Sequence, residues 1–126
     1  MMDDANVRRF LEEGRAYIAQ GDSVQASEKL YKAAEETIKA LAQRLDLPEW
    51  REATQKGRWT TTLLFRAVRV LTERLNRLEV QHGWNAAWFL HVEGFHETRL
   101  DISQVEFNLP VVEQLVELAD SAGSPP

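Results

Sequence analysis

Apolar residues recur at helical spacing along most of the chain. In the first part they predict a helix over residues 4–20, and Gly21 follows where such a helix would end. A second group predicts a helix that reaches Leu45 and begins at Asp22, with Gln25 three residues on in the capping-box position. The short link between them predicts an antiparallel hairpin, because so few residues cannot span a longer distance.

The middle of the chain alternates between weak and strong helical patterns. Residues 46–59 lack clear periodicity and predict a loop with one or two helical turns that begin at Pro48. Apolar spacing predicts a third long helix over residues 60–80, which we expect to be broken by the Gln-His-Gly that follows. Residues 84–101 then predict a fourth helix, which is apolar on nearly every side.

The end of the chain predicts a short turn over residues 103–108 and a helix over residues 110–120, because Pro110 lacks the amide hydrogen that a helix interior needs. No segment alternates apolar and polar residues in the manner of a strand. The pattern therefore predicts an all-α fold, a four-helix up-and-down bundle with additional short helices. We expect residues 1–120 to form a single domain and residues 121–126 a flexible tail.

Composition narrows the classes of function. With 126 residues, of which 44% are hydrophobic and 28% charged, the chain is typical of one globular domain. It has no cysteine, which excludes disulfides and thiolate chemistry. The acidic first residues and the lack of a long apolar run predict a cytoplasmic protein that does not enter a membrane.

The stretch WNAAWFLHVEGFHETRLD concentrates aromatic and titratable residues on the fourth predicted helix. At helical spacing, Trp84, Trp88, His91 and Phe95 share one narrow arc, which predicts that His91 points into an aromatic stripe. Gly94 costs helix stability, so we expect another helix to approach closely there.

The same stretch carries a candidate polar site. Glu93 and His96 have the spacing at which helix side chains meet, so the carboxylate could orient the imidazole as a general base, or both could bind a metal. A metal needs more ligands, and no second Glu-x-x-His occurs in the chain, so we predict neither a metal nor another cofactor. A packed histidine beside a surface pair is the favoured interpretation, with a catalytic role as the alternative. The candidate residues are His91, Glu93, His96 and Glu97.

A basic surface is predicted on the third helix. Residues 44–77 contain eight Arg or Lys against four Asp or Glu, a net charge of +4 in a chain whose total is −5. Arg66, Arg69 and Arg77 project from one side of the helix and could hold phosphates. The alternative is a solvated face whose charges pair with acids of the second helix. The candidate anion- or RNA-binding residues are Arg58, Arg66, Arg69 and Arg74.

Two stretches resemble a known family. QGDSVQASEKLYKAAEETIKALA (20–42) and LHVEGFHETRLD (90–101) resemble the archaeal paREP family of small helical proteins, over nearly the whole chain. That family is similar to the HEPN superfamily of four-helix bundles, whose members are commonly dimers and are either RNases or non-catalytic partners of small nucleotidyltransferases. The resemblance implies a HEPN-like bundle, a homodimer, and a protein partner such as a nucleotidyltransferase.

The HEPN resemblance also implies a candidate catalytic pair. HEPN RNases use an Arg-x(4 to 6)-His motif, and Arg77 with His82 in RLEVQH is the match here. The motif departs from the pattern at Leu78, where a polar residue normally follows the arginine. We therefore favour a non-catalytic, homodimeric binding or accessory subunit over an enzyme. The alternative is a metal-independent RNase or an RNA-binding protein.

Overall fold

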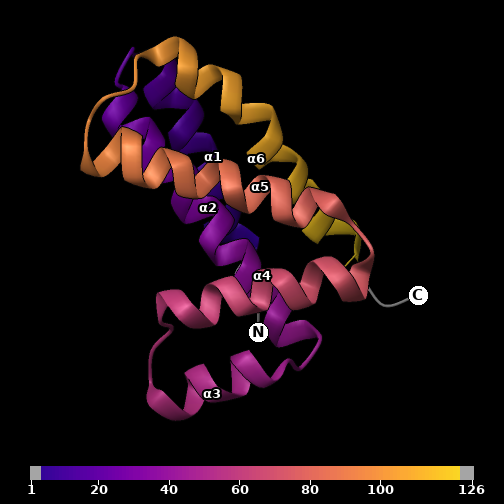
Figure 1. Cartoon of the computed structure of the whole chain (residues 1–126). Coiled ribbons are helices and arrows are strands. Elements are labelled where there is room, and N and C mark those ends of the chain that lie inside the picture. The colour runs from indigo at the N-terminus through magenta and orange to yellow at the C-terminus, as the bar shows by residue number, and fades with distance from the viewer. Residues whose placement is uncertain (1–3, 123–126) are drawn as a thin grey trace.

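The computed structural model describes residues 4–122, and this part of the chain is helical with no strand. The all-α prediction is therefore confirmed. Figure 1 shows α3 and α4 at one end of the molecule and the remaining helices packed together beside them. The α-helices are α1 (Asp4–Ala19), α2 (Ser23–Arg44), α3 (Pro48–Lys56), α4 (Thr61–Leu75), α5 (Leu78–Phe89) and α6 (Ile102–Ala122), and the π-helix η1 (Leu90–His96) continues α5.

Helix α2 is the centre of the core, because it packs against each of the other helical elements. Its apolar stripe is buried, and Leu30, Ile38 and Leu41 are its largest enclosed side chains. Within residues 4–122 no helix is both long enough and apolar enough to cross a lipid bilayer. Helix α6 continues through Ala122, and residues 123–126 of the predicted flexible tail lie outside the described residues.

The predicted hairpin of α1 and α2 is confirmed. Gly21 adopts a φ of 75°, which suits glycine, and the carboxylate of Asp22 accepts a hydrogen bond of 3.0 Å from the amide of Gln25. The two helices approach closely at Gly14, where a Cβ atom would lie 2.6 Å from Cδ2 of Leu30. A larger residue than glycine would force these helices apart.

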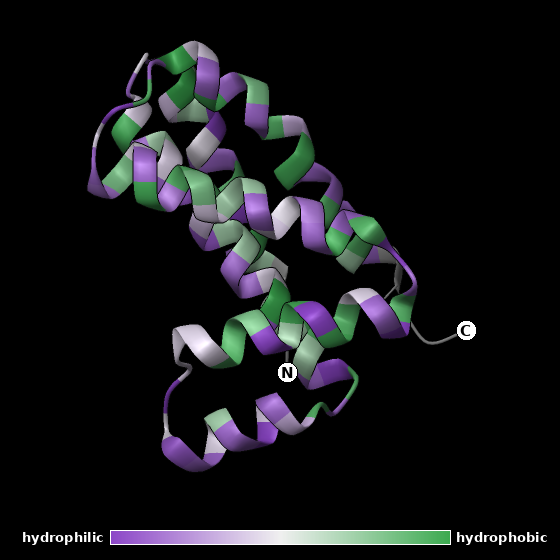
Figure 2. Ribbon diagram, viewed as in Figure 1, coloured by the Kyte–Doolittle hydropathy of each residue, from purple (hydrophilic) through white to green (hydrophobic). Residues whose placement is uncertain are grey.

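The predicted loop over residues 46–59 contains a true helix. Pro48 begins α3 at the first helical position, as expected, but the helix continues for 9 residues to Lys56. It ends at Gly57, whose φ of 75° closes the last turn. Figure 2 shows α3 mainly in the colours of hydrophilic residues, which explains why the apolar spacing was weak. Only Ala53 of this helix is buried.

The predicted break between the third and fourth helices was placed six residues too late. Helix α4 ends at Asn76, which takes the left-handed conformation with a φ of 53°, and α5 already includes the Gln-His-Gly sequence. Leu78 misled the pattern, because its side chain is 60% exposed. Gly83 lies inside α5, where a Cβ atom would overlap Leu115 of α6. It is therefore a packing glycine and not a helix breaker.

The predicted turn before Pro110 is wrong, because α6 is one helix that contains this proline. A proline there frees the carbonyl of Glu106 from its hydrogen bond, and both residues are exposed, so water can replace the lost partner. The helix begins after Asp101, whose carboxylate accepts a hydrogen bond of 3.0 Å from the amide of Gln104. Hydrogen bonds from Ser103 and then Gln104 lower the pKa of Asp101.

Candidate functional site

The π-helix η1 brings two histidines together. In an α-helix, side chains five residues apart point about 140° away from each other. A π-helix closes its hydrogen bonds between residues i and i+5, so such side chains lie one above the other. The Nε2 atoms of His91 and His96 are accordingly 3.2 Å apart. π-Helical turns are rare and are frequent at functional sites.

His91 is held against aromatic rings of two helices. Its imidazole stacks on Tyr31 of α2 with a centroid distance of 3.9 Å and an interplanar angle of 21°. Trp88 lies 5.3 Å from the imidazole and Phe95 lies 6.2 Å away, measured between ring centroids. Trp84 is stacked on Trp88 and continues the row. His91 therefore points into an aromatic stripe, as the spacing predicted.

A carboxylate of α2 completes the surroundings of His91. Oε1 of Glu28 lies 3.4 Å from Nδ1 of His91, and both side chains are largely buried. Burial, followed by the carboxylates of Glu35 and Glu28, raises the pKa of Tyr31 well above that of a free tyrosine. Tyr31 is therefore a neutral packing surface at physiological pH and does not act as a base or a nucleophile there.

The predicted pair of Glu93 with His96 is wrong. The π-helical turn directs His96 toward His91, and Glu93 is instead 3.8 Å from a guanidinium nitrogen of Arg99. Glu97 is 2.8 Å from the same guanidinium group. The four candidate residues thus divide into a histidine pair and a glutamate pair. Arg99 and Glu28 were missed, because neither belongs to the spacing that suggested the site.

Gly94 marks the place where η1 crosses α2. A Cβ atom at this position would overlap the hydroxyl of Ser27 and would lie 2.6 Å from its Cβ atom. The close approach expected at Gly94 is therefore present, and its partner is α2. Ser27, one residue before Glu28, is the small residue in α2 that could have located this crossing.

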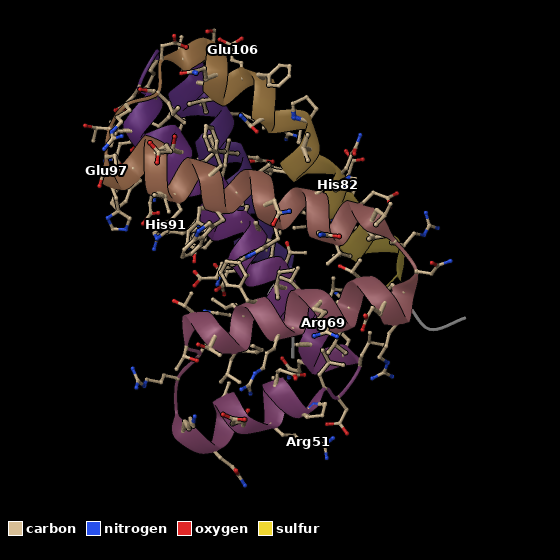
Figure 3. The ribbon with its side chains drawn as sticks, viewed as in Figure 1. Arg51, Arg69, His82, His91, Glu97 and Glu106 are labelled. Carbon is tan, nitrogen blue, oxygen red and sulfur yellow. The ribbon has the colours of Figure 1, made fainter. Side chains whose placement is uncertain are left out.

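The residues of the predicted RNase motif lie apart from the histidine pair. Figure 3 shows His82 and His91 far apart along the helix formed by α5 and η1. His82 is exposed. Arg77 precedes the first turn of α5, and its guanidinium is 3.7 Å from the carboxylate of Glu79. A small hollow beside Arg77 is also lined by Glu117, so its surroundings are acidic.

The predicted basic surface is shorter than expected. Arg66 and Arg69 project from α4 as predicted, whereas Arg77 lies beyond the break at Asn76 and does not belong to the same helix. Arg66 approaches Glu52 of α3 at 4.0 Å, and Arg69 approaches Glu73 of its own helix at 3.7 Å. These acids lie on α3 and α4, and not on the second helix as the alternative supposed. Arg58 and Arg74 are exposed nearby.

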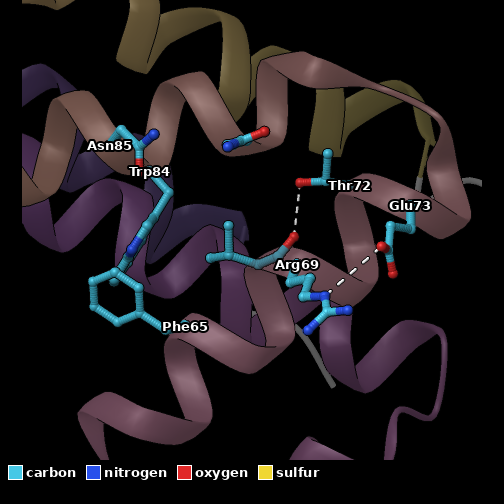
Figure 4. Close-up of a pocket in the computed structure, with 8 residues that line it drawn as sticks. Phe65, Arg69, Thr72, Glu73, Trp84 and Asn85 are labelled. Carbon is cyan, nitrogen blue, oxygen red and sulfur yellow. Dashed lines mark hydrogen bonds and ion pairs between the residues drawn. The ribbon is translucent and has the colours of Figure 1, made fainter.

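A hollow between α4 and α5 lies next to these arginines. Its volume is about 320 Å³. Figure 4 shows Phe65 and Trp84 on one side and Arg69, with its ion pair to Glu73, on the other. Asn85 also lines the hollow, whose other lining residues are Val68, Thr72 and Gln81. The lining therefore offers aromatic rings, amide groups and one guanidinium.

A second hollow lies between α5 and the start of α6. It has a volume of about 580 Å³ and is lined by Phe89, Phe107 and three uncharged polar residues, Ser103, Gln104 and Asn108. Phe107 is 82% exposed and Phe89 is 41% exposed. These two phenylalanines form the aromatic groove. The sequence gave no hint of it, because the predicted turn before Pro110 concealed the exposed face of α6.

Comparison with known proteins places this architecture among archaeal proteins. The crystal structure of a Sulfolobus solfataricus protein matches with a TM-score of 0.85 and 39% identity, and covers 93% of this chain and 95% of its own. The solution structure of a protein named Orf c02003 matches with a TM-score of 0.79 and 40% identity, over 94% and 92%. A comparison with curated proteins gave no match. The model of the archaeal PaREP1/PaREP8 family matches residues 5–116, and the chain therefore belongs to that family.

Proposed function

We propose that this chain is a HEPN-like, non-catalytic binding or accessory subunit that acts as a homodimer. The observation that carries the proposal is the aromatic groove, because an 82% exposed phenylalanine is unusual on a monomer surface. Phe107 stands beside a hollow of about 580 Å³, so the same patch offers both a projecting ring and a space to receive one. A two-fold dimer requires such a self-complementary patch.

Charge also favours a second copy as the occupant of the aromatic groove. The chain carries a net charge of −5, so two copies repel one another over most of their surface. No residue that lines the aromatic groove is charged. Two copies can therefore meet there without placing like charges together, and the phenylalanine rings supply the apolar anchors typical of interface centres.

Replacing Phe107 by serine should convert the dimer to a monomer. Wild-type protein should sediment as a dimer at micromolar concentration, whereas Phe107→Ser removes the anchor and should sediment as a monomer under the same conditions. Analytical ultracentrifugation measures both masses. Because Phe107 contacts solvent over most of its surface, circular dichroism should show an unchanged helical fold.

Leu78→Ser is the matched control for this experiment. Leu78 is also exposed, at 60%, but lies at the first residue of α5, away from the aromatic groove. This variant should remain a dimer. A wild-type monomer at 100 times the working concentration would contradict the proposal, and so would equal loss of dimer in both variants.

The surroundings of Arg77 support a role without RNA cleavage. A catalytic arginine must approach a scissile phosphate, and here Glu79 and Glu117 lie beside it. Their carboxylates repel a phosphate at the distance where the guanidinium would bind it. His82 also has no carboxylate partner to orient its ring in any interaction that the structure gives for it.

One observation favours RNA binding as a second function. The hollow between α4 and α5 combines the rings of Phe65 and Trp84 with the amide of Asn85 and the guanidinium of Arg69. Aromatic faces, amides and arginines are the groups that bind unpaired nucleotides. Arg66 extends the positive surface along the exposed side of α4. A single-stranded RNA could thus place a base in the hollow and its phosphates along the helix.

Reversing two charges on α4 should weaken RNA binding. The double variant Arg66→Glu and Arg69→Glu should bind single-stranded RNA more weakly at every sequence. The slope of log affinity against log salt should also flatten by about two, one for each lost phosphate contact. Fluorescence anisotropy with a labelled oligonucleotide at several salt concentrations measures both effects.

The control reverses two exposed charges on α1, Arg8→Glu and Arg9→Glu, which changes the net charge equally. Equal loss of affinity in both double variants would show that only the total charge matters and would contradict a site on α4. Cleavage of the oligonucleotide that disappears in His82→Ala would overturn the non-catalytic assignment.

A further inference from the structure

We propose that His91 and His96 form a binding site for a divalent transition-metal ion such as Zn²⁺, with Glu28 orienting His91 from behind. The proposal rests on the histidine pair and the π-helix that creates it. It is independent of the aromatic groove and of the basic surface on α4. Both of those could fail their tests while this one holds.

The separation of the two imidazole nitrogens fits a shared metal ion. Zinc lies roughly 2.0 to 2.1 Å from histidine nitrogens in proteins. With the Nε2 atoms of His91 and His96 3.2 Å apart, an ion at that distance from both would subtend an angle of about 100°. This angle is close to the tetrahedral value that zinc prefers. The two nitrogens need little movement to hold an ion.

Glu28 fixes the protonation pattern that a metal ligand needs. A neutral imidazole has one N–H donor and one nitrogen with a free lone pair. Glu28 lies 3.4 Å from Nδ1 of His91 and accepts its hydrogen, which leaves the lone pair on Nε2. A carboxylate behind a histidine is the usual outer partner of a metal-binding imidazole. His96 is exposed and can take the matching tautomer through exchange with water.

The fold holds His91 in place before any ion arrives. Its ring is stacked on Tyr31 at 3.9 Å, and the backbone of η1 is fixed at Gly94 by its contact with Ser27. Preorganisation of this kind lowers the cost of binding, because the ligand does not have to be ordered. The π-helical turn, which is otherwise hard to explain on a helix end, has a use if the two histidines must meet.

The number of ligands defines the kind of site. In residues 4–122 no group of three or more histidine, aspartate or glutamate side chains is placed to hold a metal, so the ion would be bound by two imidazoles only. Neutral imidazoles select zinc, copper and nickel over magnesium and calcium. Water fills the remaining positions. Such a site binds its ion reversibly and leaves positions for an oxygen or nitrogen ligand.

Titration with ZnCl₂ should show one ion bound per chain. Isothermal titration calorimetry of the full chain in a non-chelating buffer measures stoichiometry and affinity. His96→Ala should weaken binding by about tenfold or more, and Glu28→Gln by roughly 10- to 100-fold, the range for loss of an outer carboxylate partner. Since Trp88 lies 5.3 Å from His91, Cu²⁺ should also quench tryptophan fluorescence in the wild type and less in His96→Ala.

His82→Ala is the matched control, because it removes the third histidine from the same helix while keeping the pair. It should bind Zn²⁺ as the wild type does. Circular dichroism should show that His96→Ala keeps its fold, since the side chain is exposed. The proposal is overturned if wild-type protein takes up no Zn²⁺, or if His82→Ala loses as much affinity as His96→Ala.

Discussion

Leu30→Ala should lower the free energy of unfolding by about 2 to 5 kcal/mol. Leu30 has no exposed surface and lies at the crossing of α1 and α2, where Gly14 allows the helices to approach. Truncation removes apolar contacts and leaves a cavity that two tightly packed helices cannot close. Urea denaturation followed by circular dichroism measures the change from the midpoint at constant slope.

The control for the core is Leu78→Ala, the same change at an exposed site. It should alter the free energy of unfolding by less than about 0.5 kcal/mol. If Leu30→Ala cost less than about 1 kcal/mol, the assignment of the buried face of α2 would be wrong. The comparison separates the loss of a buried side chain from any effect of alanine on helix formation.

Gly94→Ala should destabilise the protein by about 1 to 3 kcal/mol, although alanine favours helices over glycine by about 1 kcal/mol. The sign is decided by Ser27, whose Cβ atom would lie 2.6 Å from the new methyl group. Helices α2 and η1 must separate to admit it. The same denaturation experiment measures the loss, and a stabilised Gly94→Ala protein would show that this crossing is not tight.

A second substitution tests the cause. Ser27→Gly removes the side chain that the new methyl group meets, and alone it should cost about 1 kcal/mol as a glycine inside a helix. If the clash is the reason, the double variant should be more stable than the sum of the two single effects implies. Additive effects would point to a cause other than contact between these residues.

The sequence revealed the elements whose local signals agree with their packing. The hairpin of α1 and α2 was predictable, because Gly21 and Asp22 have the chemistry of a helix end and a helix start. The aromatic surroundings of His91 followed from helical spacing alone. In each case the residues that decide the structure are close together in the chain, so a single sequence contains the necessary information.

The errors arose where a residue's usual effect was overridden by its surroundings. Gly83 was interpreted as a helix breaker, but it gives room to Leu115 of α6. Pro110 was interpreted as a helix end, but it lies on an exposed face where water replaces the lost hydrogen bond. Both residue types break helices on average, and neither does so here, because contacts with other helices stabilise the continuous form.

The histidine pair could not be predicted, because it depends on two facts that are absent from local patterns. An α-helical spacing analysis pairs His96 with Glu93, and only the π-helical turn pairs it with His91. Glu28 joins from another helix 63 residues earlier in the chain. No spacing rule connects such residues. The close approach at Gly94 was predictable, but not its partner on α2.

The π-helix also makes the spacing of the chain unusually sensitive to length. A π-turn accommodates about one residue more than an α-turn, so it behaves as a tolerated insertion within an otherwise ordinary helix. Loss of one residue from Leu90–His96 would let the segment close as a regular α-helix with all its backbone hydrogen bonds. The second histidine would then rotate away from the first. Relatives that differ by one residue here could share the fold and lack the pair.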